Sequence, residues 1–183
     1  MKDEMKSAIR HMVQGLAHWM AYRNEMSNIQ LIEADAILVA SDILRAQLSN
    51  DYIVEREVTR KSLSIIEERQ RIDLGIKLRQ GNTYKCLIEF KLADATNGGY
   101  AQDVEKLSTI KRINNDIDCL VVILYRKSNV FSEPKEFVSK EGTAKRGNIK
   151  ISDKNVVKVR HVCSSYASSK TPSSKKAICL EIL

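Results

Sequence analysis

The stretch from residue 71 to residue 93 constrains the fold more strongly than any other part of the chain. Apolar side chains occupy alternate positions through residues 71–78, and residues 84–92 repeat that period of two. Between the two halves, residues 80–83 read Gln-Gly-Asn-Thr, a composition typical of a tight turn. A period of two is typical of a half-buried strand, so this stretch is predicted to form a β-hairpin.

The turn also predicts which side chains meet across the hairpin. A hairpin symmetric about Gly81 places Asp73 directly opposite Glu89, with their Cβ atoms roughly 5 Å apart. Lys91 lies two residues further along the second strand and points to the same side. A slip of one residue would separate the three side chains, so this arrangement depends on the turn.

Two carboxylates and a lysine on one strand face suggest metal chemistry. Adjacent carboxylates repel each other in a low-dielectric site, whereas a divalent cation such as Mg²⁺ makes their proximity favourable. A neighbouring lysine can steady an anionic nucleophile or a phosphate. The structural alternative is an exposed hairpin face on which Lys91 and the acidic residues form ordinary cross-strand pairs.

The order of these residues resembles a known family. Asp73 followed by Glu89-Phe90-Lys91 resembles the core motif of the PD-(D/E)XK nuclease superfamily, although Ile72 stands where the motif has proline. The superfamily includes restriction endonucleases, Holliday-junction resolvases and many repair and defence nucleases. The resemblance covers roughly residues 27–125. It implies an α/β protein of restriction-endonuclease-like fold, with a central mixed β-sheet flanked by α-helices.

The resemblance also implies an activity and roles for individual residues. It implies a Mg²⁺-dependent endonuclease that acts on DNA, with Mn²⁺ able to replace Mg²⁺. Asp73, Glu89 and the carbonyl of Phe90 would ligate the metal. Lys91 would position the attacking water and help to deprotonate it.

Glu33 is a further acidic candidate. It falls near the middle of the apolar arc of a helix predicted over residues 27–49, which Ser27 is placed to cap. A carboxylate there is costly unless it is paired, so a buried ion pair is one interpretation. The resemblance supports the other, because many family members carry an acidic residue on a helix before the core sheet. In that role Glu33 would bind a second metal ion or its water.

The remaining elements complete an α/β pattern. A helix is predicted over residues 100–114, on which Gln102 and Lys106 are candidates for phosphate contacts because the family often places Gln or Lys there. The other predicted elements are a helix over residues 3–22, strands over 51–58, 117–125, 156–162 and 177–183, a short helix over 133–140, and a mobile basic loop over 164–176.

Positive charge is concentrated in the C-terminal third. Residues 1–125 contain 17 Lys and Arg against 18 Asp and Glu, whereas residues 126–183 contain 13 against 5. A one-sided basic region suggests a polyanion such as DNA, and a solubilising surface is the alternative. The candidate nucleic-acid-binding residues of this region are Lys145, Arg146 and Lys150.

Length and composition predict a single domain over residues 1–183, and the resemblance implies that this domain is nuclease-like. It would consist of an N-terminal helix (1–26), a core (27–125) and a basic C-terminal part (126–183). No apolar run approaches a membrane span, the N-terminus lacks a secretory signal, and the four cysteines form no Cys-x-x-Cys pair. These features predict a cytoplasmic protein that is not inserted in a membrane, with a homodimer as a candidate assembly.

Two other functions are compatible with the same residues. One is a catalytically inactive nucleic-acid-binding module of the same fold. The other is a structural or regulatory subunit whose hairpin charges form only surface pairs. The full set of Asp73, Glu89, Lys91 and Glu33 favours the nuclease over both.

Overall fold

The computed structural model describes residues 1–26, 32–59, 63, 71–93, 99–126, 137–139, 143–168 and 171–183. The helices are α1 (Asp3–Met26), α2 (Glu33–Gln47) and α3 (Gly99–Ile113), and the strands are β1 (Tyr52–Thr59), β2 (Arg71–Leu78), β3 (Tyr84–Ala93), β4 (Asp118–Arg126), β5 (Asn148–Lys150), β6 (Val156–Ser168) and β7 (Thr171–Ile182). None of these helices is both long enough and apolar enough to cross a bilayer.

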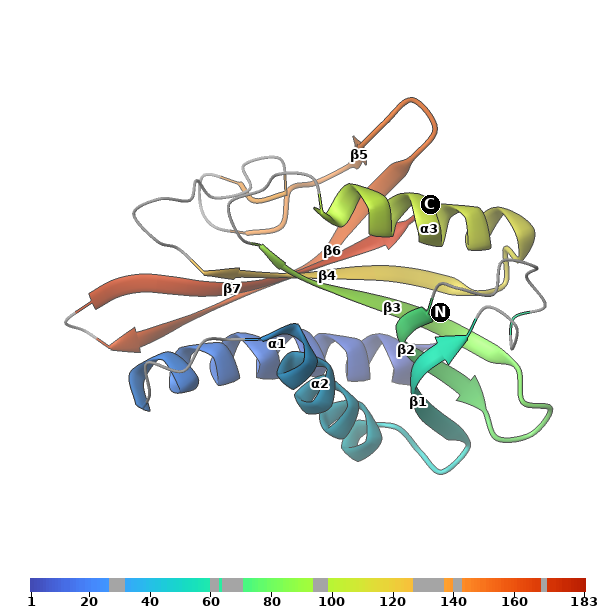
Figure 1. The fold of residues 1–183 in the computed structure, drawn as a ribbon, viewed down its shortest axis with the longest axis horizontal. Helices are drawn as coiled ribbons and strands as arrows, with labels where there is room; N and C mark the ends of the chain where they lie inside the picture. The colour runs from blue at the N-terminus through green and yellow to red at the C-terminus, as the bar shows by residue number, and fades with distance from the viewer. Residues whose placement is uncertain are drawn as a thin grey trace.

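The strands form one mixed sheet with helices on both faces. Within the described residues the sheet has seven strands in the order β1-β2-β3-β4-β7-β6-β5. β3 and β4 are parallel and are connected through α3, while the other neighbouring strands are antiparallel. Helices α1 and α2 cover one face and α3 covers the other (Figure 1). The predicted α/β architecture with a mixed sheet flanked by helices is therefore confirmed.

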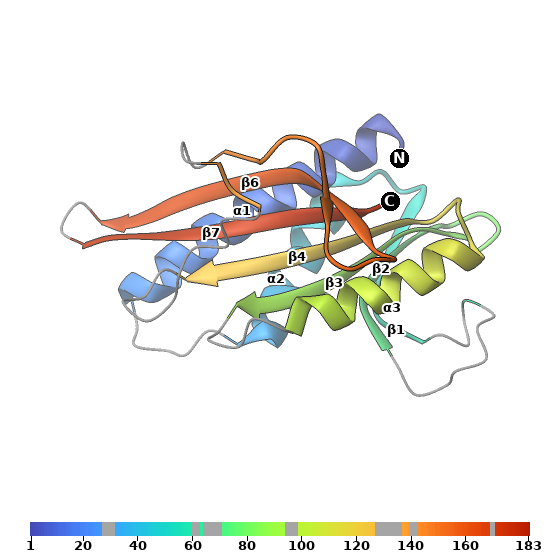
Figure 2. The same cartoon turned by 90° about the horizontal axis from the view of Figure 1, so that it is seen from above.

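Alternation along β3 divides the core between the two faces of the sheet. Phe90 packs into the cluster under α1 and α2, together with Met12 and Leu16. Leu87 points to the opposite face and packs with Leu107 of α3. Viewed from above, α3 runs alongside β3 and β4 (Figure 2). Because side chains alternate along a strand, Glu89 shares the α3 side with Leu87.

The prediction of a mobile loop over residues 164–176 is wrong. β6 extends to Ser168 and β7 begins at Thr171, so residues 164–168 and 171–176 pair with each other as the far part of a long hairpin. Ser165 is buried and its hydroxyl lies 3.1 Å from Nδ1 of His18 on α1. Small polar residues carry weak strand propensity, but pairing with a neighbouring strand and packing on a helix outweigh that preference.

Two further boundaries differ from the sequence prediction. α2 begins at Glu33 with Ile32 at its N-cap position, so Ser27, which lies outside the described residues, does not cap it. In the short helix predicted over 133–140, only residues 137–139 are described. There Val138 forms a β-bridge with Ala144 instead of a helical turn, because an antiparallel partner satisfies its backbone groups.

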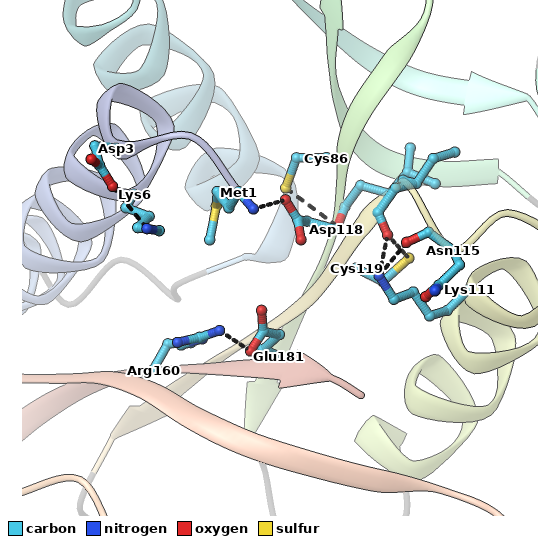
Figure 3. Close-up of polar contacts among 12 residues, drawn as sticks. Met1, Asp3, Lys6, Cys86, Lys111, Asn115, Asp118, Cys119, Arg160 and Glu181 are labelled. Carbon is cyan, nitrogen blue, oxygen red and sulfur yellow. Dashed lines mark hydrogen bonds and ion pairs between the residues drawn. The ribbon is translucent and has the colours of Figure 1, made fainter.

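Near the N-terminal end of β4, charged groups have partners of opposite charge. The amino group of Met1 lies 3.2 Å from a carboxylate oxygen of Asp118, and Arg160 pairs with Glu181 (Figure 3). The ammonium of Lys111 donates to two carbonyl oxygens just beyond α3, at 2.8 and 3.0 Å. These bonds connect the last turn of α3 to the segment that leads into β4.

The cysteines lie within the fold as free thiols. Cys86, Cys119 and Cys179 are buried and Cys163 is half-buried. Burial raises the pKa of Cys119 and of Cys179 to about 12 in each case. These two thiols therefore stay protonated near neutral pH and act as small apolar side chains.

The packing around Gly75 predicts that this strand position tolerates no side chain. A Cβ there would lie 2.7 Å from both Cε1 of Tyr84 and Cγ2 of Val58. Gly75→Ala should therefore destabilise the fold by about 1–3 kcal/mol, as overpacked cores do. Urea denaturation measures the change.

The matched control is Gly15→Ala in α1, where an added Cβ meets the end of the flexible Ile43 side chain. This side chain can rotate away, and alanine favours a helix over glycine by about 1 kcal/mol. The control should be neutral or stabilising. Equal midpoints for wild type and Gly75→Ala would contradict the packing argument.

Candidate functional site

The hairpin has the register predicted from its turn over the part that leads to the site. Leu74 pairs with Ile88, and the following pairs keep this register as far as Ile76. The register then shifts by one residue beside the turn, where Lys77 pairs with Tyr84. The predicted symmetric hairpin is therefore wrong next to the turn. The shift does not affect the candidate carboxylates, because they lie at the other end of the paired segment.

Beyond Leu74, two carboxylates bind the edge of β3. Oδ2 of Asp73 accepts the backbone N–H of Phe90 at 2.8 Å, and Oε2 of Glu33 accepts that of Leu92 at 3.1 Å. Alternate N–H groups of a strand normally donate to the neighbouring strand. Here the two side chains take that place, so acidic groups from β2 and α2 converge on β3.

The Phe90 carbonyl faces the same gap. In a strand, the N–H and C=O groups of one residue point to the same edge, and the N–H of Phe90 points to Asp73. The carbonyl oxygen is therefore available beside the carboxylates, as expected for the ligand set predicted from the sequence.

Glu89 lies in the interior between β3 and α3. Glu89 is only 4% exposed, and its carboxylate forms an ion pair with the ammonium of Lys106. Burial, reinforced by the nearby charge of Asp73, raises the pKa of Glu89 to about 8, although Lys106 opposes the shift. Asp73 and Glu89 thus lie close enough to influence each other strongly, as the hairpin register predicts.

Lys91 and Glu33 are both partly open to solvent. The ammonium of Lys91 lies 3.9 Å from Oε2 of Glu33, and both side chains are about one-third exposed. Glu33 is the first residue of α2, so its carboxylate extends from the end of the helix. Glu33 lies on the helix face of the buried Ala36, Ala40 and Leu44, as predicted. The expectation that its carboxylate is buried is wrong, because Glu33 is the first residue of the helix and its side chain is partly exposed.

Sequence reasoning missed Asp103 of α3. Its Oδ2 atom is buried and has no hydrogen-bond partner within the described part of the chain. Burial raises the pKa of Asp103, Lys91 and then Lys106 oppose the shift, and Asp73 and Glu33 reinforce it. Its position three residues before Lys106 places both on one face of the helix, and this spacing was the available signal.

The phosphate-contact candidates on α3 have different environments. Gln102 is exposed. Lys106 is largely buried and is held by Glu89 and by the backbone carbonyl of Arg71, so its ammonium is not open to a phosphate in this state.

The balance of charge at the site differs from that around Asp118. Among the described residues, the interacting groups here are four carboxylates and two lysines. The carboxylates are Glu33, Asp73, Glu89 and Asp103, and the lysines are Lys91 and Lys106. With all six groups ionised, the site has an excess of two negative charges, which a divalent cation could compensate.

The acidic groups of the site suit a cation that keeps most of its water ligands. In the described ranges, no three His, Cys, Asp or Glu side chains are grouped closely enough to hold an ion among them. Mg²⁺ is usually bound through only one or two protein carboxylates, together with water and substrate phosphates. The two carboxylates of Asp73 and Glu89 and the Phe90 carbonyl match that mode in number and type of donor. Each carboxylate also has a protein partner, since Asp73 accepts the N–H of Phe90 and Glu89 pairs with Lys106, as Glu33 accepts the N–H of Leu92.

Backbone strain accompanies the carboxylates. Glu57 has a φ of 54° and lies in β1 between the residues that pair with Leu74 and with Ile72. It is therefore opposite Asp73. A non-glycine residue in the left-handed region costs roughly 1–3 kcal/mol, and such residues concentrate at functional sites. Asp73 thus lies between the strained residue Glu57 of β1 and the backbone of Phe90 in β3.

An open groove leads to Asp73 from the α2 side. Its volume is about 710 Å³, and it is lined by Ala34, Ile37, Leu38, Arg45, Ile53, Val54, Glu55, Arg56, Glu57, Asp73 and Lys77. The lining combines apolar side chains with three cations and three carboxylates, Glu55, Glu57 and Asp73. Lys77 pairs with Glu55 at 2.7 Å, so the groove has no excess of positive charge.

The basic candidates of the C-terminal part lie elsewhere. Lys145 and Arg146 are exposed just before β5, and Lys150, at the end of β5, pairs with Asp153 at 2.7 Å. β5 is the edge strand opposite β1, so β4, β7 and β6 separate it from β3. The fold therefore does not bring these three residues beside the carboxylates.

Comparisons of the chain with protein-family models, curated proteins and solved structures find no match. The function proposed below therefore depends on the geometry and chemistry of the site itself.

The raised pKa of Glu89 predicts how stability varies with pH. The folded state retains the proton to a higher pH than the unfolded chain, so stability should fall between about pH 4.5 and 8 in metal-free buffer. This group contributes a slope of at most about 1.4 kcal/mol per pH unit. Glu89→Gln cannot ionise, so it should not lose this stability. The unfolding free energy of the variant minus that of wild type should therefore increase as the pH rises from about 4.5 to 8.

Urea denaturation at a series of pH values measures this effect. Glu105→Gln is the control, because it removes a largely exposed carboxylate from α3, outside the cluster formed by Glu33, Asp73, Glu89 and Asp103. It should retain the wild-type pH dependence. Parallel stability curves for wild type and Glu89→Gln would contradict the electrostatic account of the site.

Proposed function

We propose that the protein is a Mg²⁺-dependent nuclease that hydrolyses phosphodiester bonds of DNA, in a fold of the restriction-endonuclease-like type. The observation that carries the proposal is the convergence of Asp73, Glu89, Lys91 and Glu33 where β2 leaves β3. Asp73 and Glu33 bind neighbouring N–H groups of β3, and Glu89 interacts electrostatically with Asp73. A purely structural strand would gain nothing from grouping these carboxylates.

The chain's own residues support a division of roles. Asp73, Glu89 and the Phe90 carbonyl would hold the cation, and Glu33 would bind a second ion or its water. When bound, the cation would neutralise charge that develops on the scissile phosphate. Lys91 is partly exposed and would orient the attacking water and help to remove its proton.

Two surfaces support DNA as the substrate. The groove beside Asp73 is lined by Arg45, Arg56 and Lys77. Lys77 pairs with Glu55 and Arg45 with Asp42, so Arg56 is the cation that could hold a phosphate close to the carboxylates. The exposed cations near β5 would provide a second, sequence-independent contact with the DNA backbone. This interpretation assigns substrate positioning to the groove and general affinity to the basic C-terminal part.

A catalytically inactive DNA-binding module is the second candidate. It is favoured by the ion pair between Lys106 and Glu89, which occupies one of the proposed metal ligands. Calorimetric titration with Mn²⁺ tests whether the site binds metal at all. Incubation of plasmid and branched DNA with Mg²⁺ then separates a nuclease, which cuts, from a module that only binds. A structural subunit would bind neither metal nor DNA.

Lys91→Ala should separate catalysis from metal binding. Its fold should remain, and Mn²⁺ should still bind because the carboxylates are unchanged. Cleavage should fall on the order of 10²-fold or more, comparable to the loss of a positioned general base or charge-stabilising donor. Asp73→Ala should abolish both metal binding and cleavage.

Single-turnover cleavage and Mn²⁺ calorimetry provide the two measurements. Lys85→Ala is the matched control, since this lysine lies on the same strand near the turn. It should cleave at the wild-type rate. Wild-type cleavage by Lys91→Ala, or no cleavage by wild type with any divalent metal, would reject the nuclease proposal.

Neutralising Lys145, Arg146 and Lys150 together should weaken DNA binding to all sequences alike. Each phosphate contact that is lost should reduce the slope of log affinity against log salt by about 0.9 on duplex DNA. Fluorescence anisotropy over a range of salt concentrations measures both effects.

The matched control neutralises Lys2, Lys6 and Arg10, three exposed cations at the start of the chain, on the other face of the sheet from α3. That variant should have the wild-type slope. An unchanged slope for the C-terminal variant would move the main DNA-binding surface elsewhere.

A further inference from the structure

Lys106 occupies a position that the proposed chemistry does not use. Its ammonium pairs with Oε1 of Glu89 and also donates to the backbone carbonyl of Arg71. The side chain is only 15% exposed, so this cation is held inside the site between α3 and the sheet. It neutralises one of the two carboxylates that would hold a metal ion.

Asp103 provides a second acceptor within reach of the same lysine. The two residues are three apart on α3, a spacing that makes their side chains neighbours on the helix surface. Oδ2 of Asp103 is buried and has no hydrogen-bond partner within the described residues. A buried carboxylate oxygen without a partner is costly, so an incoming ammonium would stabilise it.

We propose that Lys106 is a tethered cation that competes with the divalent metal for Glu89, and that Asp103 accepts its ammonium when the metal binds. The inference deepens the proposed function and rests on it, because the competition takes place at Asp73 and Glu89. It makes Lys106 and Asp103 positioning residues that set the affinity and the selectivity of the site.

The exchange keeps the charges of the site paired in both states. Without metal, Lys106 compensates Glu89, and with metal the cation does so. A displaced ammonium without an acceptor would be left unpaired in a largely buried site, which is strongly unfavourable. Asp103 removes that cost, and the flexible stem of lysine, with three donors on its ammonium, allows the movement without a change in the helix.

The same arrangement favours divalent over monovalent cations. A monovalent ion would replace one positive charge at Glu89 with another and gain little. A divalent ion adds a charge, which also compensates Asp73. The site should therefore discriminate strongly against Na⁺ and K⁺.

Mn²⁺ binding to the full chain tests the competition directly. Lys106→Met removes the charge and approximately retains the side-chain volume, and Lys106→Gln also retains a donor for the Arg71 carbonyl. Both should bind Mn²⁺ about tenfold more tightly than wild type, or more, which corresponds to roughly 1.4 kcal/mol per factor of ten. The stabilisation of the fold by saturating Mn²⁺ should also increase in thermal melts.

A double-mutant cycle tests the role of Asp103. Asp103→Asn should weaken Mn²⁺ binding several-fold in the wild-type background, because the displaced ammonium has no acceptor. In the Lys106→Met background, the same substitution should change affinity by less than about twofold, since nothing remains to be accepted. If Asp103 instead acts only by attracting the metal ion with its negative charge, Asp103→Asn should weaken Mn²⁺ binding equally in wild type and in Lys106→Met.

Glu105 and Arg112 form the matched control pair on the same helix. They are 3.4 Å apart and largely exposed. Glu105→Gln and Arg112→Met remove the same types of charge, and neither should change Mn²⁺ affinity by more than about twofold if the coupling is specific.

The outcomes distinguish this inference from the proposed function. Equal Mn²⁺ affinity in wild type and both Lys106 variants would overturn the competition, while leaving metal-dependent cleavage standing. Equal effects of Asp103→Asn in both backgrounds would overturn the exchange. Binding only in the Lys106 variants would support the inference in its strongest form. No binding in any variant would reject both the inference and the nuclease proposal.

Discussion

The hydrogen bond from the N–H of Phe90 to Asp73 is the interaction on which the candidate site depends. It replaces a backbone contact between β2 and β3 with a side-chain contact, and it therefore marks where the two strands part. Glu33 repeats the arrangement two residues further along β3. Because both carboxylates are oriented by a rigid strand, their positions are defined by the sheet. Fixed positions of this kind favour ligand binding, since little order has to be gained on association.

The distribution of charge explains why this region differs from the rest of the molecule. Around Asp118 and Glu181, each carboxylate has a cationic partner. At the site, acidic groups outnumber the lysines, and Glu89 is buried with a pKa of about 8. An arrangement that raises the pKa of a buried carboxyl so far is unfavourable for stability at neutral pH. Strongly shifted carboxyl pKa values concentrate at functional sites, so this arrangement supports the proposal that the site binds a metal ion.

The hairpin was predictable because its information is local. The alternation of residues 71–78 and 84–92, with the turn between them, defines two strands and a register that holds from Leu74 to Ile76. The buried strand β4 and the helix α3 were predictable for the same reason. The hairpin of β6 and β7 was not, because residues 164–176 have the local composition of a loop. Only pairing with a neighbouring strand and packing on α1 make that segment extended.

The sequence by itself determined the alternating strands, the hairpin register from Leu74 to Ile76 and the order in which Asp73, Glu89 and Lys91 occur. These depend on residues close together in the chain, whose periodicity and turn chemistry act locally. Only the tertiary structure decided that Glu33 lies at the start of α2, that Lys106 pairs with Glu89, and that Asp103 faces the same site. It also separated the basic residues near β5 from the carboxylates. The physical reason is that each of these contacts joins elements distant in sequence, and the packing of helices on the sheet sets which side chains meet.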